Sequence, residues 1–168
     1  FDLGTDGTGY DAIIRPGGGC RNQFNEDTLK LELCEDGRKR HAIQTRMKGM
    51  DVFAFGITTA PKSIKKLTAN YEMDYTSFDY VILHQANYKM IETIRKKLKL
   101  DAEKMPYSML HFGNTSSASI PLTIVTQLKG KIEDKPTKII GCAFGVGLSW
   151  GTVAFETEHL LISELVEV

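Results

Sequence analysis

Three short segments of the 168-residue sequence place polar or glycine-rich residues between apolar runs. His84 directly follows the β-rich run 80–83, and Asn114 lies in the small-residue segment HFGNTSSASIP, ahead of an apolar stretch with helical spacing. The glycine-rich FGVG, residues 144–147, joins two further β-rich runs. Ligands of open α/β sheets bind where strands end and helices begin. These segments therefore form the candidate site.

The combination of His84 with Asn114 suits a specific chemistry. Two neutral N–H donors aimed at one carbonyl oxygen stabilise the negative charge that develops when a thioester enolate forms. Losing one such donor typically costs about 3 kcal/mol of barrier. We therefore predict that both residues are catalytic.

Each of the three features also has a purely structural explanation. A histidine at a strand end is often only hydrogen bonded within the fold, and an asparagine before a helix is often a turn or cap residue. Glycines between two strands can simply permit a tight hairpin. The occurrence of all three at the same kind of junction favours a functional site.

A cysteine, a histidine and an asparagine also form the catalytic set of papain-like proteases, whose cysteine lies at a helix N-terminus. No cysteine of this chain has that position. Cys142 lies in an apolar strand pattern, and Cys20 and Cys34 lie in the weakly patterned first quarter. We expect buried or inert thiols. Their odd number and wide spacing indicate a reduced cytosolic chain and neither a disulfide scaffold nor a zinc site.

Composition and charge exclude several classes of partner. The chain has 21 basic and 21 acidic residues, so no net field attracts nucleic acid or an anionic membrane. The longest uncharged run, 139–155, is interrupted by glycines and is short for a membrane span of about 20 residues. The first ten residues lack the basic start and apolar stretch of a signal peptide. We expect one globular domain over residues 1–168.

Hydrophobic periodicity predicts the elements that position the candidate residues. Apolar residues at steps of three and four predict a helix over 50–71, which Pro61 should kink or split. Residues 78–85 predict a strand, and 87–100 predict a helix whose apolar face contains Ile91, Ile94 and Leu98.

The remaining segments complete an α/β pattern. A helix running to about Lys129 should be capped by the serines and threonine after Asn114, with Pro121 in its first turn. Residues 138–144 and 148–156 predict strands, and residues 1–46 predict loops with short strands. Strands alternating with helices indicate a mixed, mainly parallel sheet with helices on both faces.

Three motifs, in their order and spacing, resemble β-ketoacyl-acyl-carrier-protein synthase III, a family of condensing enzymes that start bacterial type II fatty-acid synthesis. They are HQAN (84–87), GNTSSAS (113–119) and AFGVGLSWG (143–151). The resemblance is strong over residues 45–156 and looser over DGTGYDAIIRPGGGCR. It implies a thiolase-like fold of two similar α/β halves, of which this chain is the C-terminal one. The family's nucleophilic cysteine belongs to the other half, and no residue here matches it.

The resemblance implies a role for each matching residue. His84 and Asn114 match the pair that polarises the malonyl thioester carbonyl, and Asn87 matches a residue lining the phosphopantetheine channel. A backbone N–H of the glycine-rich loop helps to form the oxyanion hole for acyl transfer. The matching amide is that of Val146, where the family more often has glycine, so its side chain should crowd the pocket. The substrate-binding loop expected here consists of Phe144, Gly145, Val146 and Gly147.

Partners and cofactors are also implied by the resemblance. Lys89 stands where relatives often carry an arginine that meets the acyl-carrier protein. Carrier proteins are acidic, so a basic helix face could dock one, or it could be only a solvated surface. The basic residues concerned are Lys89, Arg95, Lys96, Lys97 and Lys99. The family implies a cytoplasmic homodimer that uses acyl-CoA and phosphopantetheine thioesters as substrates and needs no metal or organic cofactor.

The implied reaction is the decarboxylative Claisen condensation of an acyl primer with malonyl-acyl-carrier protein. This chain would supply the His and Asn part of the site and would be inactive alone. The alternatives are a specialised-pathway enzyme acting on another thioester pair and a non-catalytic, condensing-enzyme-like binding subunit. A pure scaffold needs neither His84 nor Asn114, which argues against the latter. The closing HLLISELVEV, 159–168, could cover a partner or add an edge strand.

Overall fold

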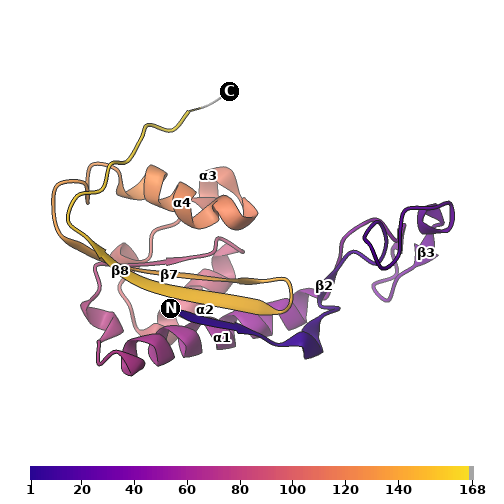
Figure 1. The fold of residues 1–168 in the computed structure, drawn as a ribbon, viewed down its shortest axis with the longest axis horizontal. Coiled ribbons are helices and arrows are strands. Elements are labelled where there is room, and N and C mark those ends of the chain that lie inside the picture. Colours follow the sequence, from indigo (N-terminus) through magenta and orange to yellow (C-terminus); the bar gives the residue numbers. More distant parts are fainter. Residues whose placement is uncertain (167–168) are drawn as a thin grey trace.

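A four-stranded mixed sheet forms the centre of the computed structural model, which describes residues 1–166. Glu167 and Val168, the end of the predicted tail, lie outside the described residues. Figure 1 shows helices on both faces of the sheet, with α1 and α2 on one face and α3 and α4 on the other. The strand order is β1 (Asp2–Thr5), β8 (Ser149–Thr157), β7 (Thr137–Gly145) and β6 (Tyr80–Leu83).

The pairing of the strands confirms a mixed sheet but not a mainly parallel one. Only β6 and β7 pair in parallel, whereas β7 with β8 and β8 with β1 are antiparallel. The three residues 146–148 that join β7 to β8 can only reverse the chain, which makes a hairpin. A crossover that contains helices separates β6 from β7, and such connections produce parallel pairs.

The long helix α1 (Gly49–Asn70) remains one helix through Pro61, so the predicted split is wrong. Proline cannot donate the hydrogen bond that the carbonyl four residues earlier, that of Ile57, would otherwise accept. The Lys97 ammonium of α2 (Tyr88–Leu98) replaces this donor, with Nζ 2.9 Å from the Ile57 oxygen. A neighbouring helix thus satisfies the acceptor that the proline leaves open.

The main core fills the space between the sheet and the helices α1 and α2. The predicted apolar face of α2 is buried there, with Ile91, Ile94 and Leu98 at most 1% exposed. Each fully buried aliphatic side chain of this kind contributes roughly 1.5–3 kcal/mol. Their partners include Ala60 and Ile64 of α1 and strand residues of β6 and β7, namely Val81, Leu83, Ile140 and Phe144.

The helical segment on the other face ends near Lys129, and Pro121 lies in the first turn of α4, both as predicted. It comprises a 3-10 turn (Ser116–Ala118), α4 (Ser119–Thr123) and a π-helical turn (Ile124–Leu128), and it follows the short α3 (Met109–Phe112). No serine or threonine side chain caps the 3-10 turn or α4, so that prediction is wrong. Ala118, at the N-cap of α4, has no polar side chain, and the Thr115 hydroxyl, at the N-cap of the 3-10 turn, is buried without a hydrogen-bond partner.

A smaller core lies under this segment, and the C-terminal segment adds to it. Ile82 and Ile139 of the sheet contact Leu128, Ile132 and Ile162 there. Residues 158–166 form no strand, so the extra edge strand is wrong for that described part. Within residues 1–166 no helix combines the length and apolar character that a membrane span requires.

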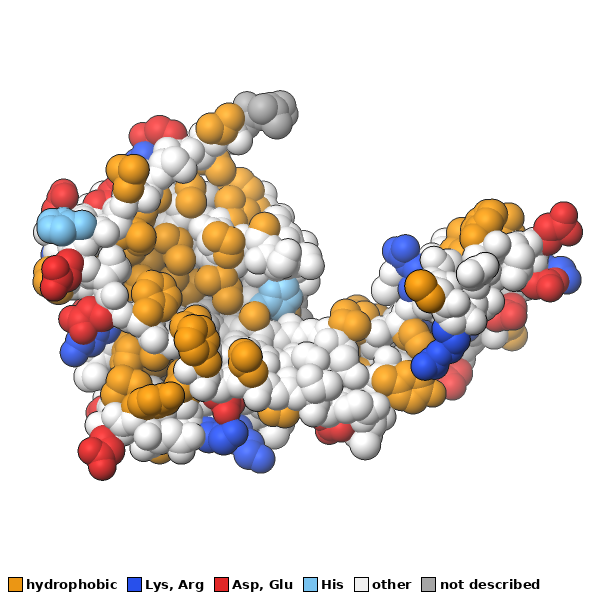
Figure 2. All heavy atoms as spheres, in the orientation of Figure 1, with side chains coloured by type: hydrophobic (Ala, Val, Ile, Leu, Met, Phe, Trp, Pro, Cys, Tyr) orange, Lys and Arg blue, Asp and Glu red, His pale blue; other side chains and the backbone are white. Residues whose placement is uncertain are grey.

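Residues 10–47 form an arm that projects from the body (Figure 1). As predicted, it consists of loops with short strands. Its strands are β2 (Ile13–Ile14), β3 (Glu32–Leu33), β4 (Lys39–Arg40) and β5 (Arg46–Met47). The chain also has 3-10 turns at Gly7–Gly9, Asp27–Leu29, Tyr75–Ser77 and Ala102–Lys104. Large apolar side chains are exposed on the arm (Figure 2), including Phe24, Leu31 and Leu33.

Replacing Lys97 by methionine should lower the free energy of unfolding by about 0.5–1 kcal/mol, because the Ile57 carbonyl loses a solvent-exposed donor. The same replacement should cost less when Pro61 is alanine, since alanine at that position supplies the missing N–H. Urea unfolding of the wild type, K97M, P61A and the double variant of the full-length protein measures this coupling. Equal losses in both backgrounds would show that Lys97 does not compensate for the proline.

Candidate active site

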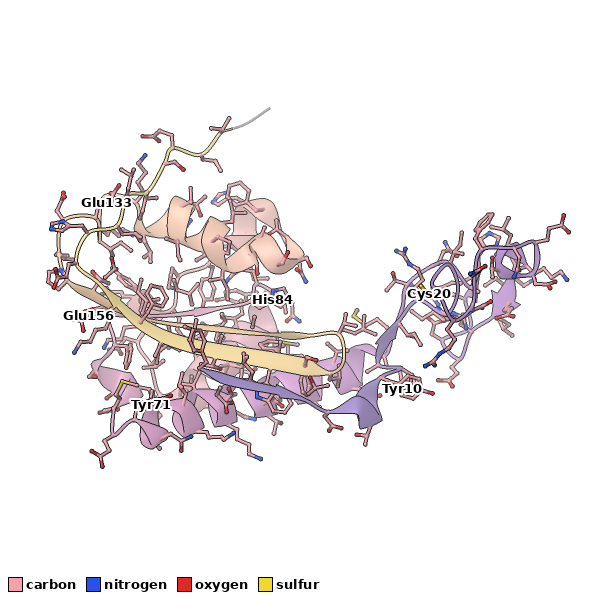
Figure 3. All side chains as sticks on the ribbon, viewed as in Figure 1. Tyr10, Cys20, Tyr71, His84, Glu133 and Glu156 are labelled. Atoms are coloured by element: carbon pink, nitrogen blue, oxygen red, sulfur yellow. The ribbon has the colours of Figure 1, made fainter. Side chains whose placement is uncertain are left out.

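The three predicted segments line one open cavity of about 710 Å³, within the size range of ligand sites. His84 lies at the end of β6, between α4 and the β7–β8 hairpin (Figure 3). Parallel pairing places Leu83 beside Cys142, and the His84 N–H continues this pairing by donating to the Cys142 carbonyl at 2.9 Å. The cavity lining includes His84, Asn114, Ser116, Ser119, Phe144, Gly145, Val146 and Trp150.

The imidazole of His84 is half-buried and is hydrogen bonded through one of its two nitrogens. Its Nδ1 lies 2.8 Å from the Ser119 hydroxyl, which leaves Nε2 as the nitrogen available to a ligand. Burial lowers the pKa of His84 below its usual value of 6.5, and hydrogen bonding by the Ser116 backbone partly opposes this shift. The ring is therefore neutral at pH 7, as a neutral hydrogen-bond donor must be.

Asn114 is exposed and follows a backbone reversal at Gly113, whose φ is +64°. Its Oδ1 accepts the Ser116 N–H at 2.9 Å, so the turn role considered from the sequence is present. A backbone N–H can only donate, which identifies the oxygen of the amide and leaves Nδ2 as the group with donors to spare. The turn therefore also orients Asn114 as a donor.

The loop between β7 and β8 contributes backbone and aromatic surface. The Phe144 ring meets the His84 ring edge-on, with 5.8 Å between the centroids. Val146 is 66% exposed, and no described residue accepts a hydrogen bond from its N–H. Gly147 does not line the cavity, but its φ of +142° and the clash that any Cβ would make with Ser149 Oγ require glycine in this turn.

The chain is similar to known proteins over most of its length. Residues 68–157, more than half of the chain, match the family model described as 3-oxoacyl-[acyl-carrier-protein] synthase III C terminal. The chain belongs to this family. A curated relative from Clostridium acetobutylicum, named beta-ketoacyl-[acyl-carrier-protein] synthase III, is 34% identical over 154 residues, which are 92% of this chain and 44% of the relative.

A solved structure from Burkholderia xenovorans, titled 3-oxoacyl-(acyl-carrier protein) synthase, is similar over 99% of this chain and 46% of its own, with a TM-score of 0.85 and 31% identity. A synthase III of Streptococcus pyogenes is 36% identical over 146 residues, which are 85% of this chain and 44% of that protein. The chain thus spans about half the length of the relatives it matches. The thiolase-like fold and the C-terminal half predicted from the motifs are confirmed.

Two side chains that position the cavity residues were not predicted as site residues, namely Ser119 and Gln85. Gln85 is fully buried, and its amide donates to the Leu83 carbonyl and accepts from the Ser108 N–H at 3.1 Å. It thereby ties the end of β6 to the start of α3, which leads to Asn114. The sequence did contain a signal for Gln85, because it is a polar residue inside the HQAN motif, just after the apolar strand 80–83.

The two predicted residues on α2 lie away from the cavity lining. Asn87 caps α2, because its Oδ1 accepts the Met90 N–H at 2.9 Å. Lys89 is exposed in the first turn of that helix. Two members of the proposed docking face have partners within the chain, since Arg95 pairs with Glu92 and Lys97 binds the Ile57 carbonyl. The basic surface is therefore smaller than the sequence indicated.

No cysteine among the described residues lines the cavity. Cys142 is fully buried, and burial raises the pKa of its thiol to about 12, so the expectation of an inert thiol is confirmed. Cys20 is exposed on the arm (Figure 3), and Cys34 is partly exposed, so neither thiol is buried, and their being inert stays a prediction. Among residues 1–166 no three His, Cys, Asp or Glu side chains are grouped to hold a metal ion.

A second cavity of about 470 Å³ lies where the arm meets α1. Four of its charged side chains pair with one another, with 2.8 Å between Arg40 and Asp36 and 2.7 Å between Lys48 and Asp11. None of the predicted site residues lines it. It therefore offers no set of unpaired groups for catalysis.

The lowered pKa of His84 predicts a pH dependence of stability. Between the folded-state pKa and the usual 6.5, the unfolded chain binds more protons than the folded protein. Stability is therefore fully present above pH 6.5 and falls as the pH decreases through this window. Urea unfolding of the full-length protein between pH 7 and 5 should show a weaker dependence for H84Q than for the wild type. H159Q, which replaces an exposed histidine, is the control and should behave as the wild type.

Proposed function

We propose that the full-length protein catalyses the decarboxylative Claisen condensation of an acyl primer, delivered as acyl-CoA, with malonyl-acyl-carrier protein, which initiates fatty-acid synthesis. This chain supplies the His and Asn part of the site, and the upstream half supplies the cysteine that carries the primer. The enzyme is a cytoplasmic homodimer and needs no metal or organic cofactor. The relatives' names support the reaction class, and the geometry of His84 and Asn114 supports their roles.

The observation that carries the proposal is that His84 and Asn114 line one cavity with their other polar atoms already bonded. Ser119 holds His84 Nδ1, and the Ser116 N–H holds Asn114 Oδ1. Nε2–H and Nδ2–H thus remain for one acceptor, the malonyl thioester oxygen. Charge that moves onto this oxygen is stabilised by donors that need no reorganisation.

The reaction balances with these two donors. The bond between the malonyl carboxylate and Cα breaks, CO2 leaves, and the electron pair moves into the thioester to form an enolate. The enolate carbon then attacks the acyl thioester on the cysteine of the other half, forming a carbon–carbon bond and releasing the thiolate. The Val146 N–H, which no described residue uses, stabilises the oxyanion of this second step.

Substrate access follows from the same arrangement. Phe144 and Gly145 line the cavity and form its wall beside the thioester. Asn87 has its amide nitrogen free, because only its oxygen caps α2, and it binds the phosphopantetheine arm as that arm approaches. The exposed Val146 side chain restricts the size of the primer.

An apolar face of the sheet supports the need for a second half. Hydrophobic side chains gather on this face of the body (Figure 2). Leu3 is 74% exposed and Phe155 38% exposed, and both line an open apolar groove with Ile120 and Ile124. An exposed apolar patch of this kind marks an interface. We assign this face to contact with the upstream half.

H84A and N114A of the full-length protein should each lower the rate of malonyl decarboxylation by about 100- to 1,000-fold, because each removes one donor to the enolate oxygen. Acylation of the cysteine by acyl-CoA should stay within about twofold of the wild type, since its oxyanion donor is the backbone of Val146. Single-turnover assays of the two half-reactions separate these effects. Normal decarboxylation in either variant would refute the assigned role of that residue.

K89E should raise the KM for malonyl-acyl-carrier protein by about tenfold or more and leave the KM for malonyl-CoA nearly unchanged, because only the carrier protein presents an acidic surface. The effect on the carrier protein should weaken in high salt. K138E, which changes an exposed lysine of β7, is the matched control. Equal effects of K89E on both substrates would remove the docking role.

A further inference from the structure

The Ser119 hydroxyl determines where the ring proton of His84 can lie. It is the one side-chain group among residues 1–166 that is hydrogen bonded to the imidazole, with 2.8 Å between Oγ and Nδ1. Ser119 is 1% exposed, so water does not compete for the hydroxyl. The hydroxyl and Nδ1 are therefore hydrogen bonded to each other with few competing partners.

The polar atoms around the hydroxyl determine the direction of this hydrogen bond. The backbone N of Gln85 lies 3.3 Å from Ser119 Oγ and can only donate, so it uses one lone pair. The hydroxyl proton then needs an acceptor, and within the described chain the only one at hydrogen-bond distance is His84 Nδ1. A proton on Nδ1 would leave the hydroxyl proton buried without a partner, which is unfavourable.

We propose that Ser119 is a positioning residue that donates to Nδ1 of His84 and thereby holds the neutral tautomer with its proton on Nε2. The inference deepens the proposed function, since it explains why Nε2 presents a hydrogen rather than a lone pair to the thioester oxygen. No covalent step is involved. The ring keeps one proton, and the hydroxyl keeps its own.

The Ser116 backbone is a second group that acts on the ring. Its hydrogen bonding raises the pKa of His84 and so favours the charged ring over the neutral one. This effect is smaller than that of burial, which lowers the pKa of the ring, whereas the Ser119 hydroxyl lies 2.8 Å from Nδ1 in a buried contact. The Ser119 contact therefore dominates the choice of tautomer.

Nitrogen NMR of the full-length protein labelled with 15N-histidine reports the tautomer directly, because two-bond couplings identify the protonated nitrogen. The chain has four histidines, and the spectrum of H84Q assigns the His84 signals by their absence. At pH 7 the wild type should show a protonated Nε2 and an unprotonated Nδ1. A protonated Nδ1 in the wild type would overturn the proposal without any variant.

S119A should convert His84 to a mixture of tautomers and lower kcat for malonyl decarboxylation by about 10- to 100-fold, as residues that orient a working histidine do. The KM should change by less than about twofold. S119T keeps a hydroxyl and should restore both the tautomer and kcat. An unchanged tautomer in S119A would refute the role.

T123V is the matched structural control. Thr123 is buried on the same helix, and its hydroxyl donates to the Ser119 carbonyl at 2.8 Å without touching His84. T123V should lose stability but keep the wild-type tautomer, so a tautomer change in T123V would assign the effect to packing. If H84A decarboxylates normally while the NMR shows the Nε2 tautomer, the catalytic role fails and the Ser119 inference survives.

Discussion

The parallel pairing of β6 with β7 is the constraint on which the site depends. It places Leu83 beside Cys142, and the next hydrogen bond, from the His84 N–H to the Cys142 carbonyl, fixes the histidine at the edge of the sheet. The Phe144 ring, two residues farther along β7, then meets the imidazole. Burial of Val81, Leu83 and Ile140 beneath the helices stabilises this register, because a shift by one residue would turn them toward the opposite face.

Each proposed donor of the site is oriented by a hydrogen bond to the polar atom that does not face the substrate. Ser119 holds one nitrogen of His84, and the Ser116 N–H holds the oxygen of Asn114. Gln85 joins the two segments, since its buried amide binds both the Leu83 carbonyl and the Ser108 N–H. Such prior ordering matters because donors that are already in place stabilise developing charge without the cost of reorganisation.

Contacts between elements that are distant in sequence accompany two departures from the structure predicted by local sequence rules. A proline inside a helix leaves a carbonyl without its donor, yet α1 continues through Pro61 because Lys97 of α2 reaches the Ile57 oxygen. The serines after Asn114 do not cap the helical segment that follows. The Ser119 hydroxyl, in the first turn of α4, binds groups at the end of β6. The contacts of Lys97 and Ser119 are with residues that are distant in sequence, so local propensity could not indicate them.

The sequence alone determined the elements and the family, because hydrophobic periodicity reports which face of a helix or strand is buried and the three motifs keep a distinctive order and spacing. It also identified His84, Asn114 and the 144–147 loop as candidates, since a polar or glycine-rich break at the same kind of junction in all three segments favours a site over three separate structural roles. The tertiary structure alone decided the largely antiparallel pairing, the roles of Ser119 and Gln85, and the partners of Arg95 and Lys97. Those features depend on contacts that form only once strands and helices pack. The hydrophobic pattern of the sequence does not indicate which distant residues will meet.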